Sequence, residues 1–263
     1  MSEKLAGQNF VVIGGTDGLG RSAALALIHA GASVVVVGLR DESVDRAKKE
    51  LGDHARVLKA DATEENTAQQ AIEHCISEFG GFNGLYHVAG GSGRAFGDGP
   101  LHELTLAGWN KTMEMNLTSL MLSNRAAIRT LLERKTSGTI LNMGSVLGYA
   151  PSPKYFTTHA YAAAKSAVIG FTRSLAAAYA KNNIRINVIA PALVETPMSA
   201  RASGNPEIQK FIKTKQPLDG GRIGKPEDLD ELVVYLLSDA SKFVTGQVFA
   251  VDGGWSVTEG QYV

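Results

Sequence analysis

The stretch FVVIGGTDGLG, residues 10–20, joins an apolar run to a turn that contains four glycines. Residues 10–13 predict a β-strand, and a helical pattern follows near residues 19–30. Gly14 allows a sharp exit from the strand, while Gly18 and Gly20 let the backbone approach a pyrophosphate without an intervening Cβ. A glycine-rich turn that binds nothing is the alternative. The strand–turn–helix order favours a dinucleotide site. Its predicted cofactor-binding residues are Gly14, Thr16, Asp17, Gly18, Leu19 and Gly20.

Short apolar runs alternate with longer helical patterns from one end of the chain to the other. Strands are predicted over residues 10–13, 34–37, 56–59, 85–88, 139–143, 184–189 and 247–251. Helices are predicted near residues 19–30, 41–51, 64–79, 107–134, 160–181 and 226–238. Continuous hydrophobic strands are typical of a parallel sheet that is buried on both faces. The alternation predicts an α/β fold, a three-layer doubly wound Rossmann-type architecture with a seven-stranded parallel sheet.

No linker, repeat or low-complexity block divides the sequence, so residues 1–263 are predicted to form one domain. Two segments break the alternation. One is a glycine-heavy loop over residues 90–100, and the other is an insertion over about 195–225 with a possible helix over 206–215. Both follow strand ends, at the edge where open α/β sheets bind ligands. The second segment is interpreted as a substrate lid, and an ordinary surface loop is the alternative.

The charge balance argues against several classes of partner. The 26 Lys and Arg residues equal the 26 Asp and Glu residues, so no basic excess favours nucleic acid or an anionic membrane. No apolar run reaches the ~18 residues that a spanning helix needs, and no leader-type segment is evident. Cys75 is the single cysteine, which suits a reducing compartment. A cytoplasmic location is expected, and no metal site is expected because the histidines lack metal-ligand spacing.

The end of the second predicted strand bears on the choice of cofactor. An acid that accepts hydrogen bonds from the adenosine ribose is typical there, but the sequence has Gly38, Leu39 and Arg40. No carboxylate repels a 2′-phosphate and Arg40 can pair with one, so NADP(H) is favoured over NAD(H). Asp17 in the glycine turn favours NAD(H) instead, because its negative charge would lie near the cofactor phosphates. Asp61, after the third strand, is expected to hold the adenine amino group or, alternatively, to cap the following helix.

The chemistry is predicted from Tyr161-Ala-Ala-Ala-Lys165. Residues i and i+4 share one face of a helix, which brings the ammonium near the phenol. A free phenol has a pKa of ~10, and a cation ~4 Å away would lower it by about three units at most. The phenol would then titrate near working pH, where a proton-transfer group is most effective. Ser145 lies at the end of the fifth strand, where its hydroxyl can bind the substrate oxygen beside Tyr161.

Asn116 falls inside the helix predicted near residues 107–134. Asparagine is unfavourable in a helix interior, so its presence there needs a reason. Holding a water that relays protons to Lys165 would be one. The predicted catalytic residues are therefore Asn116, Ser145, Tyr161 and Lys165, with a small carbonyl compound or alcohol as substrate.

These features together resemble the short-chain dehydrogenase/reductase family, in particular its single-domain branch. The glycine spacing, Asn116, Ser145 and the Tyr161/Lys165 pair carry the resemblance, which extends to Val251-Asp-Gly-Gly254 and covers essentially the whole chain. It implies an NAD(P)(H)-dependent oxidoreductase. In it, Tyr161 exchanges the proton, Lys165 lowers the pKa of the phenol and binds the nicotinamide ribose, and Ser145 positions the carbonyl. A homotetramer, or a homodimer, is also implied.

The resemblance implies contacts with the nicotinamide from the stretch after the sixth strand, with Thr196 near the carboxamide. Beyond the glycine turn and residues 38–40, the predicted cofactor-binding residues are Asp61, Ala62, Ala89, Gly90, Tyr161, Lys165, Pro191, Ala192, Val194 and Thr196. Four positions depart from the family pattern: Ile13 replaces a threonine, His87 and Val88 replace two asparagines, and Ala192 replaces a glycine. We therefore expect the central strands to lack the amides that usually tie them together.

Two alternatives to a small-ketone, sugar or polyol enzyme stay open. One is a 3-oxoacyl carrier-protein reductase, although Ala176-Ala177-Ala178 is neutral where such enzymes often have basic side chains. The other is a non-catalytic NADP(H)-binding sensor, against which the intact set of four predicted catalytic residues argues. In the predicted lid, Arg201, Lys210, Lys213 and Lys215 are interpreted as solvated surface charge, with recognition of an anionic substrate as the alternative.

Overall fold

Seven parallel strands form one sheet in the computed structural model, which describes residues 4–260. The strand order is β3-β2-β1-β4-β5-β6-β7, and neighbouring strands pair in parallel. The strands are β1 Asn9–Ile13, β2 Ser33–Gly38, β3 Ala55–Lys59, β4 Gly84–His87, β5 Gly138–Met143, β6 Ile184–Pro191 and β7 Val248–Val251. The predicted α/β fold with a seven-stranded parallel sheet is confirmed. The one-domain prediction also includes residues 1–3 and 261–263, which lie outside the described residues, and it stays a prediction.

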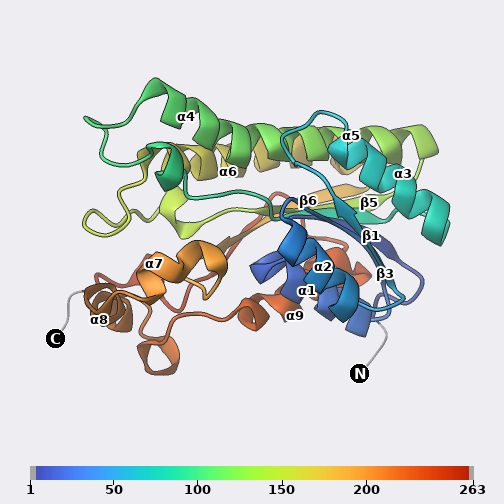
Figure 1. The fold of residues 1–263 in the computed structure, drawn as a ribbon. Coiled ribbons are helices and arrows are strands. Elements are labelled where there is room, and N and C mark those ends of the chain that lie inside the picture. Colours follow the sequence, from blue (N-terminus) through green and yellow to red (C-terminus); the bar gives the residue numbers. More distant parts are fainter. Residues whose placement is uncertain (1–3, 261–263) are drawn as a thin grey trace.

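Helices cover both faces of the sheet, which gives three layers (Figure 1). The helices on one face are α1 (Gly18–His29), α2 (Asp41–Glu50) and α9 (Asp230–Leu237). Those on the other face are α3 (Thr67–Phe79), α5 (Ser119–Arg134) and α6 (His159–Tyr179). Successive residues of a strand point to opposite faces, so Val12 belongs to the first core and Val11 to the second. Within residues 4–260, no helix combines the length and the apolar character that crossing a membrane demands.

Two short helices lie in the segment that is predicted as a lid (Figure 1): α7 (Ala200–Ser203) and α8 (Pro206–Lys215). The helix predicted over 206–215 is confirmed. Asn205 caps it by accepting hydrogen bonds from two backbone N–H groups of the first turn. Its apolar face packs through Ile212 into a cluster with Trp255. The segment is therefore anchored by a small core that it shares with Val146 and Trp255, while closure over a substrate stays a prediction.

The helix predicted near residues 107–134 widens locally. A π-helical turn, Glu114–Thr118, separates α4 (Leu106–Met113) from α5. The side chains of Asn116 and Ser119 each donate to the carbonyl four residues earlier, at 2.9 Å and 2.7 Å. The backbone N–H of Ser119 instead reaches the carbonyl five residues earlier. Side-chain competition for the helical carbonyls thus accompanies the wider turn, and π turns frequently occur at functional sites. The helix predicted near 226–238 also differs, because a 3₁₀ turn, Pro226–Leu229, precedes α9.

β4 is tied to α5 by an imidazole in place of the amides that the family pattern led us to expect. The ring nitrogens of His87 lie 2.7 Å from Ser123 Oγ and 3.4 Å from Ser119 Oγ. Burial lowers the pKa of His87 to about 3, and the charge of Lys165 acts in the same direction. A neutral ring therefore holds the strand against the helix.

A second buried polar cluster ties β5 to the helices of the same face. Asn142 and Asn124 exchange side-chain hydrogen bonds at 2.8 Å and 3.0 Å, and Asn142 Nδ2 also donates to Thr172 Oγ1 at 3.0 Å. All three side chains are fully buried. A buried polar group without a partner costs about 1–3 kcal/mol, so the cluster is stable only when complete.

We predict that Asn142→Ala lowers the free energy of unfolding by about 2–4 kcal/mol, because Asn124 and Thr172 each lose a partner. Urea unfolding followed by circular dichroism measures the effect. Asn182→Ala, at an exposed position after α6, is the control and should change stability by less than about 0.5 kcal/mol. An Asn142→Ala protein as stable as the control would contradict the role of the cluster.

Candidate active site

One cavity of about 580 Å³ lies along the carboxyl ends of the strands. Its lining includes Gly14 after β1, Gly38 at the end of β2, Ala89 beyond β4, Ser145 beyond β5 and Pro191 at the end of β6. The chain runs from β1 outward through β2 to β3 and then crosses back to β4, on the other side of β1. Such a switch in strand order leaves a crevice in which open α/β sheets bind ligands.

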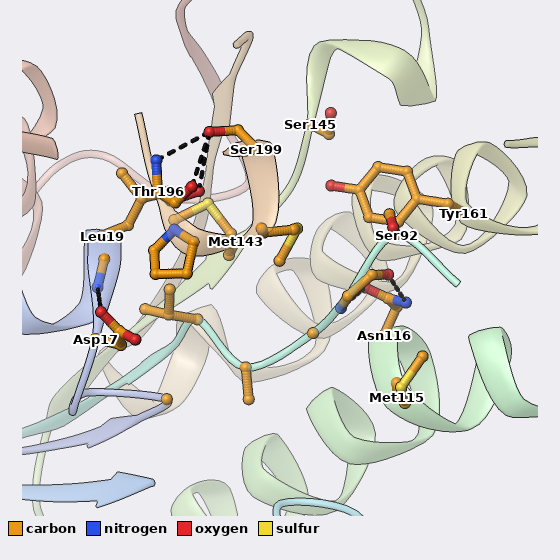
Figure 2. Close-up of a pocket in the computed structure, with 18 of the residues that line it drawn as sticks. Asp17, Leu19, Ser92, Met115, Asn116, Met143, Ser145, Tyr161, Thr196 and Ser199 are labelled. Atoms are coloured by element: carbon orange, nitrogen blue, oxygen red, sulfur yellow. Dashed lines mark hydrogen bonds between the residues drawn. The ribbon is translucent and has the colours of Figure 1, made fainter. Parts of the chain in front are cut away.

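The predicted site residues converge on this cavity. All of the predicted catalytic and cofactor-binding residues except Gly20 line it. Gly20 instead allows close packing within the turn, because a Cβ at this position would lie 2.1 Å from the carbonyl oxygen of Gly14. Figure 2 shows Tyr161 on one side of the cavity and Asp17 on the other. We call these two regions the tyrosine end and the glycine-turn end.

The glycine turn offers main-chain donors at the start of α1. Arg21 N makes the first main-chain bond of the helix, to Asp17 O at 3.1 Å, and the Asp17 carboxylate accepts from Gly18 N at 2.8 Å. The N–H groups of Leu19 and Gly20 precede that first bond. Gly18 has a φ of +47°, a conformation that favours glycine. A helix N-terminus with main-chain N–H groups still free of helical partners fits the pyrophosphate of a dinucleotide.

Two arginines hold Asp17 in place. Arg40 Nη2 lies 2.6 Å from one carboxylate oxygen, and Arg46 Nη2 lies 3.0 Å from the other. The Arg40 side chain is 64% exposed and lines the cavity. The negative charge of the glycine turn is therefore compensated, which the sequence alone did not indicate.

Steric crowding explains why glycine, and not an acid, occupies position 38 at the end of β2. A Cβ at Gly38 would lie 1.9 Å from Thr16 Oγ1. That hydroxyl is buried and lies 3.0 Å from Ser43 Oγ in α2. Any side chain at position 38 would have to displace Thr16 and break this contact.

Asp61 lines the cavity but does not cap the following helix. Its Oδ1 accepts hydrogen bonds from Thr63 N and Thr63 Oγ1, both at 2.8 Å. α3 begins at Thr67, later than predicted, and the Thr67 hydroxyl donates to Asp61 O at 2.6 Å. The capping alternative is wrong because a turn ahead of the helix uses the carboxylate. A contact with adenine stays a prediction.

The hydroxyl groups of Ser145 and Tyr161 lie at the tyrosine end, where Figure 2 also shows Ser92. Ser145 is buried at the end of β5, and the half-buried Tyr161 lies in the first turn of α6. Burial raises the pKa of Tyr161, and a hydrogen bond with Ser145 opposes the rise. The predicted fall in this pKa is therefore not what the structure produces, because loss of hydration disfavours the phenolate.

Lys165 lies one helical turn beyond Tyr161, as the spacing predicts. Its side chain is buried, and Nζ donates to Met143 O at 2.8 Å. Nζ also lies 5.6 Å from the centroid of the Tyr161 ring, within the range of a cation–π contact. Burial lowers the pKa of Lys165 to about 8. The amine is therefore shared between the end of β5 and the phenol ring.

Asn116 is fully buried in the π turn and holds the loop after β4. Its Nδ2 donates to Gly91 O at 2.8 Å, and its Oδ1 accepts from Gly91 N at 3.2 Å. A Cβ at Gly90 would lie 2.6 Å from Asn116 Oδ1 and 3.7 Å from Lys165 Nζ. Glycine at this position lets the loop, the amide and the amine come together. A role in proton relay stays a prediction.

The stretch after β6 closes against the glycine turn. Thr196 N donates to Ser199 Oγ at 2.9 Å (Figure 2). A Cβ on Gly18 would lie 3.2 Å from Thr196 Cγ2, so the two segments are in close contact. Val194 forms an isolated parallel bridge with Gly224. These contacts hold the predicted nicotinamide-binding stretch beside the cavity.

Asp98, which no sequence pattern singles out, positions the start of α6. Its two carboxylate oxygens accept from Ala160 N at 3.0 Å and from Tyr161 N at 2.8 Å. Asp98 lies 62 residues before Ala160, in the glycine-heavy loop, and no local pattern connects the two segments. A carboxylate at a helix N-terminus is favoured by the helix dipole, so Asp98 fixes the turn that carries Tyr161.

Further side chains line the cavity at the tyrosine end, and no local sequence pattern connects them. They include Arg94, Met115, Phe156, Met198, Arg201 and Trp255. Among them is Arg201, which the sequence led us to interpret as solvated surface charge, with recognition of an anionic substrate as the alternative. In the part of the chain that the structure describes, no three His, Cys, Asp or Glu side chains form a group that could hold a metal ion.

Known proteins resemble the chain over nearly its full length. A family model described as "Enoyl-(Acyl carrier protein) reductase" matches residues 14–256. A 2,5-dichloro-2,5-cyclohexadiene-1,4-diol dehydrogenase from Sphingobium indicum is 33% identical over 253 residues, 96% of this chain and 98% of the relative. A 2-(S)-hydroxypropyl-CoM dehydrogenase 3 from Xanthobacter autotrophicus is 37% identical over 261 residues, 97% and 98% of the two chains. A cis-4-hydroxycyclohexanecarboxylate dehydrogenase from Sinomonas cyclohexanicum is 34% identical over 258 residues, 97% and 99%.

A solved structure of another reductase is also similar to this chain. The 3-oxoacyl-[acyl-carrier protein] reductase from Brucella melitensis superposes with a TM-score of 0.84 at 30% sequence identity, over 98% of this chain and 94% of that one. The same family is indicated by the family model, by the relatives and by the parallel sheet with a cavity at its edge. The chain belongs to the short-chain dehydrogenase/reductase family and is an oxidoreductase that acts on CH–OH groups.

Proposed function

We propose that this chain interconverts a ketone or aldehyde and the corresponding alcohol, and that Tyr161 is the group that exchanges the proton. The family uses NAD(P)(H) as its redox cofactor. The observation that carries the proposal is that Ser145, Tyr161, Lys165 and Asn116 line the same cavity as the glycine turn. The cytoplasmic location and the homotetramer stay predictions.

In the direction of reduction, the substrate carbonyl oxygen binds between the hydroxyls of Ser145 and Tyr161. Ser145 donates a hydrogen bond that holds the oxygen, and Tyr161 transfers its proton to that oxygen as the alcohol forms. A bound nicotinamide supplies the hydride that the carbonyl carbon accepts. The charged form of Lys165 stabilises the phenolate that remains on Tyr161.

The protonation states at the tyrosine end suit this role. Burial favours the neutral phenol, which is the form that donates a proton during reduction. Lys165, with a pKa of about 8, is still mostly protonated near pH 7 and is at hand when negative charge develops on Tyr161. Asn116 holds the loop at Gly90–Gly91, which passes close to Lys165.

Small alcohols and ketones are the proposed substrate class. The three relatives reported above are named for small alcohols, one of which also carries a carboxylate. A related structure is named as a 3-oxoacyl carrier-protein reductase, so an acyl thioester belongs among the compounds tested. A non-catalytic sensor is set aside, because the chain belongs with oxidoreductases.

We predict that Tyr161→Phe lowers turnover by at least ~10²-fold, the scale of general acid–base help, while cofactor binding is retained. Cofactor oxidation followed at 340 nm with cyclic ketones, 2-alkanones, aldoses and a 3-oxoacyl thioester measures turnover. Fluorescence titration measures cofactor binding.

Tyr179→Phe is the matched control, because Tyr179 lies at the other end of α6 and does not line the cavity. This variant should keep wild-type turnover. Turnover of Tyr161→Phe at the wild-type rate would exclude the proposed proton donor, and cofactor binding without turnover of any compound would favour a sensor.

Burial of Lys165 also predicts a dependence of stability on pH. Its pKa is about 8 in the fold against an ordinary value of 10.5, so between these values the unfolded chain binds more protons. The cost of burying the charge is present below pH 8 and disappears as the pH rises toward 10.5. Lys165→Met should therefore gain stability over the wild type at pH 7, and the gain should shrink by up to about 3 kcal/mol by pH ~10.

Urea unfolding of both proteins from pH 7 to pH 10 measures this difference. Lys181→Met is the control, because Lys181 is exposed just beyond the same helix. Its stability difference from the wild type should be constant over that range. A constant difference for Lys165→Met as well would mean that the amine is not buried as described.

We also propose that NADP(H) is preferred over NAD(H). Position 38 cannot hold the acid that typically binds the ribose, because Thr16 fills the space. Arg40 and Arg46 together carry two positive charges against the single charge of Asp17. A 2′-phosphate near the end of β2 would therefore meet a net positive charge.

We predict that Arg40→Gln raises the Kd of NADPH by about ten-fold or more, since a charged hydrogen bond contributes about 1.5–3 kcal/mol. The Kd of NADH should change by less than about three-fold. Isothermal titration calorimetry measures both constants, and Lys49→Gln, an exposed position in α2, is the control. Equal weakening of both cofactors would contradict the proposed preference.

A further inference from the structure

Two arginines meet at the tyrosine end of the cavity. Arg94 lies in the 3₁₀ turn Arg94–Phe96, and Arg201 lies in α7. Both line the cavity, and Nη2 of each donates to Tyr155 O, at 3.3 Å and 3.2 Å. Tyr155 belongs to the segment that joins Ser145 to Tyr161. Two guanidinium groups from distant parts of the chain therefore converge on one neutral carbonyl near the proposed proton donor.

Among the described residues, no carboxylate forms an ion pair with either arginine. Asp98 is the acid whose charge acts on Arg94, but its oxygens accept the two backbone N–H groups at the start of α6. Burial and the charge of Arg201 both lower the pKa of Arg94. The two like charges thus oppose each other, which an anion between them would relieve.

The donors needed to bind an anion are present. A guanidinium carries five N–H groups in a planar fork, and Nη2 is the donor toward Tyr155 O for both arginines. The fork matches the two oxygens of a carboxylate, and such charge-assisted pairs are about twice as strong as neutral ones.

The rest of the wall at this end is largely apolar. Its side chains include Met115, Val146, Leu147, Phe156, Met198 and Trp255. Phe156 packs edge-on against Trp255 with ring centroids 5.5 Å apart. Trp255 Nε1 donates to Ala150 O at 2.9 Å, so the indole N–H is already used. This wall suits the hydrocarbon body of a substrate, and the arginine pair is its charged anchor.

We propose that Arg94 and Arg201 form an anion subsite, and that the substrate is an alcohol or ketone with a hydrocarbon body and a carboxylate or sulfonate remote from the reacting carbon. The inference rests on the proposed function, since it assumes that the reacting oxygen binds at Tyr161 and Ser145. Anchoring the far end of a substrate orients the carbonyl toward these hydroxyls, and orientation is a large part of catalysis.

A purely structural role is the competing explanation. The two arginines could simply hold the segment around Tyr155, which also contacts Phe211 of α8 with ring centroids 5.3 Å apart. In that case, loss of either arginine would affect charged and neutral ligands alike. An anion subsite predicts that only the charged ligand suffers.

Binding to the wild-type protein is tested first with cofactor present, using probes that cannot react. Cyclohexanecarboxylate and cyclohexanesulfonate should each bind with a Kd at least about ten-fold below that of cyclohexanecarboxamide, which has a similar shape and no charge. Isothermal titration calorimetry measures the three constants. Equal affinities, or no detectable binding of either anion, would overturn the subsite.

Variants then assign the effect to the two arginines. Arg94→Gln and Arg201→Gln should each weaken binding of the anions at least about ten-fold and leave the amide within about three-fold. Arg201→Lys, which retains the charge, should recover part of the loss. Lys210→Gln, an exposed lid cation that does not line the cavity, should bind all probes as the wild type does. Equal losses for charged and neutral probes, or a loss in Lys210→Gln, would also overturn the subsite.

Turnover separates this inference from the proposed function. With 4-oxocyclohexanecarboxylate and its carboxamide, the wild type should have a kcat/KM at least about ten-fold higher for the acid. If both ketones are reduced equally, the proposed function survives and the subsite does not. If the anions bind through the arginines but no ketone is reduced, the subsite survives and the proposed function does not.

Discussion

Parallel pairing of β1 with β4 is the constraint on which the site depends. The pairing aligns Ile13 with His87, so the glycine turn and the loop after β4 leave the sheet at the same level. Gly14 then packs so closely against Ala89 that a Cβ would lie 2.6 Å from the Ala89 nitrogen. Because β2 and β3 lie on one side of this pair and β5 to β7 on the other, the crossing leaves a crevice between the two halves.

Polar groups buried beside this crevice take their partners mainly from main-chain atoms. Lys165 donates to Met143 O, Asn116 bonds both main-chain groups of Gly91, and Asp98 accepts from the first N–H groups of α6. Main-chain partners are held by the sheet and helices, so the side chains have little freedom to move. The same burial lowers the pKa of Lys165 and raises that of Tyr161. Main-chain hydrogen bonds thus fix these side chains, and exclusion of water shifts their proton affinities.

Positive charge stands at both ends of the cavity. At the glycine-turn end, Arg40 and Arg46 outweigh Asp17. At the tyrosine end, Arg94 and Arg201 share one carbonyl. A chain whose formal net charge is zero thus concentrates positive charge at the proposed sites of the 2′-phosphate and of the substrate anion.

Features that depend on short stretches were determined by the sequence itself: the strands, the glycine turn and the helical spacing of Tyr161 and Lys165. These follow from backbone sterics and side-chain periodicity, which act over a few residues. Tertiary structure decided the rest. The Asp98 contact with α6, the pairing of Asp17 with Arg40 and the meeting of Arg94 with Arg201 join segments far apart in the chain. The direction of the Tyr161 pKa shift belongs with them, because hydration of a phenol depends on what the whole fold places around it.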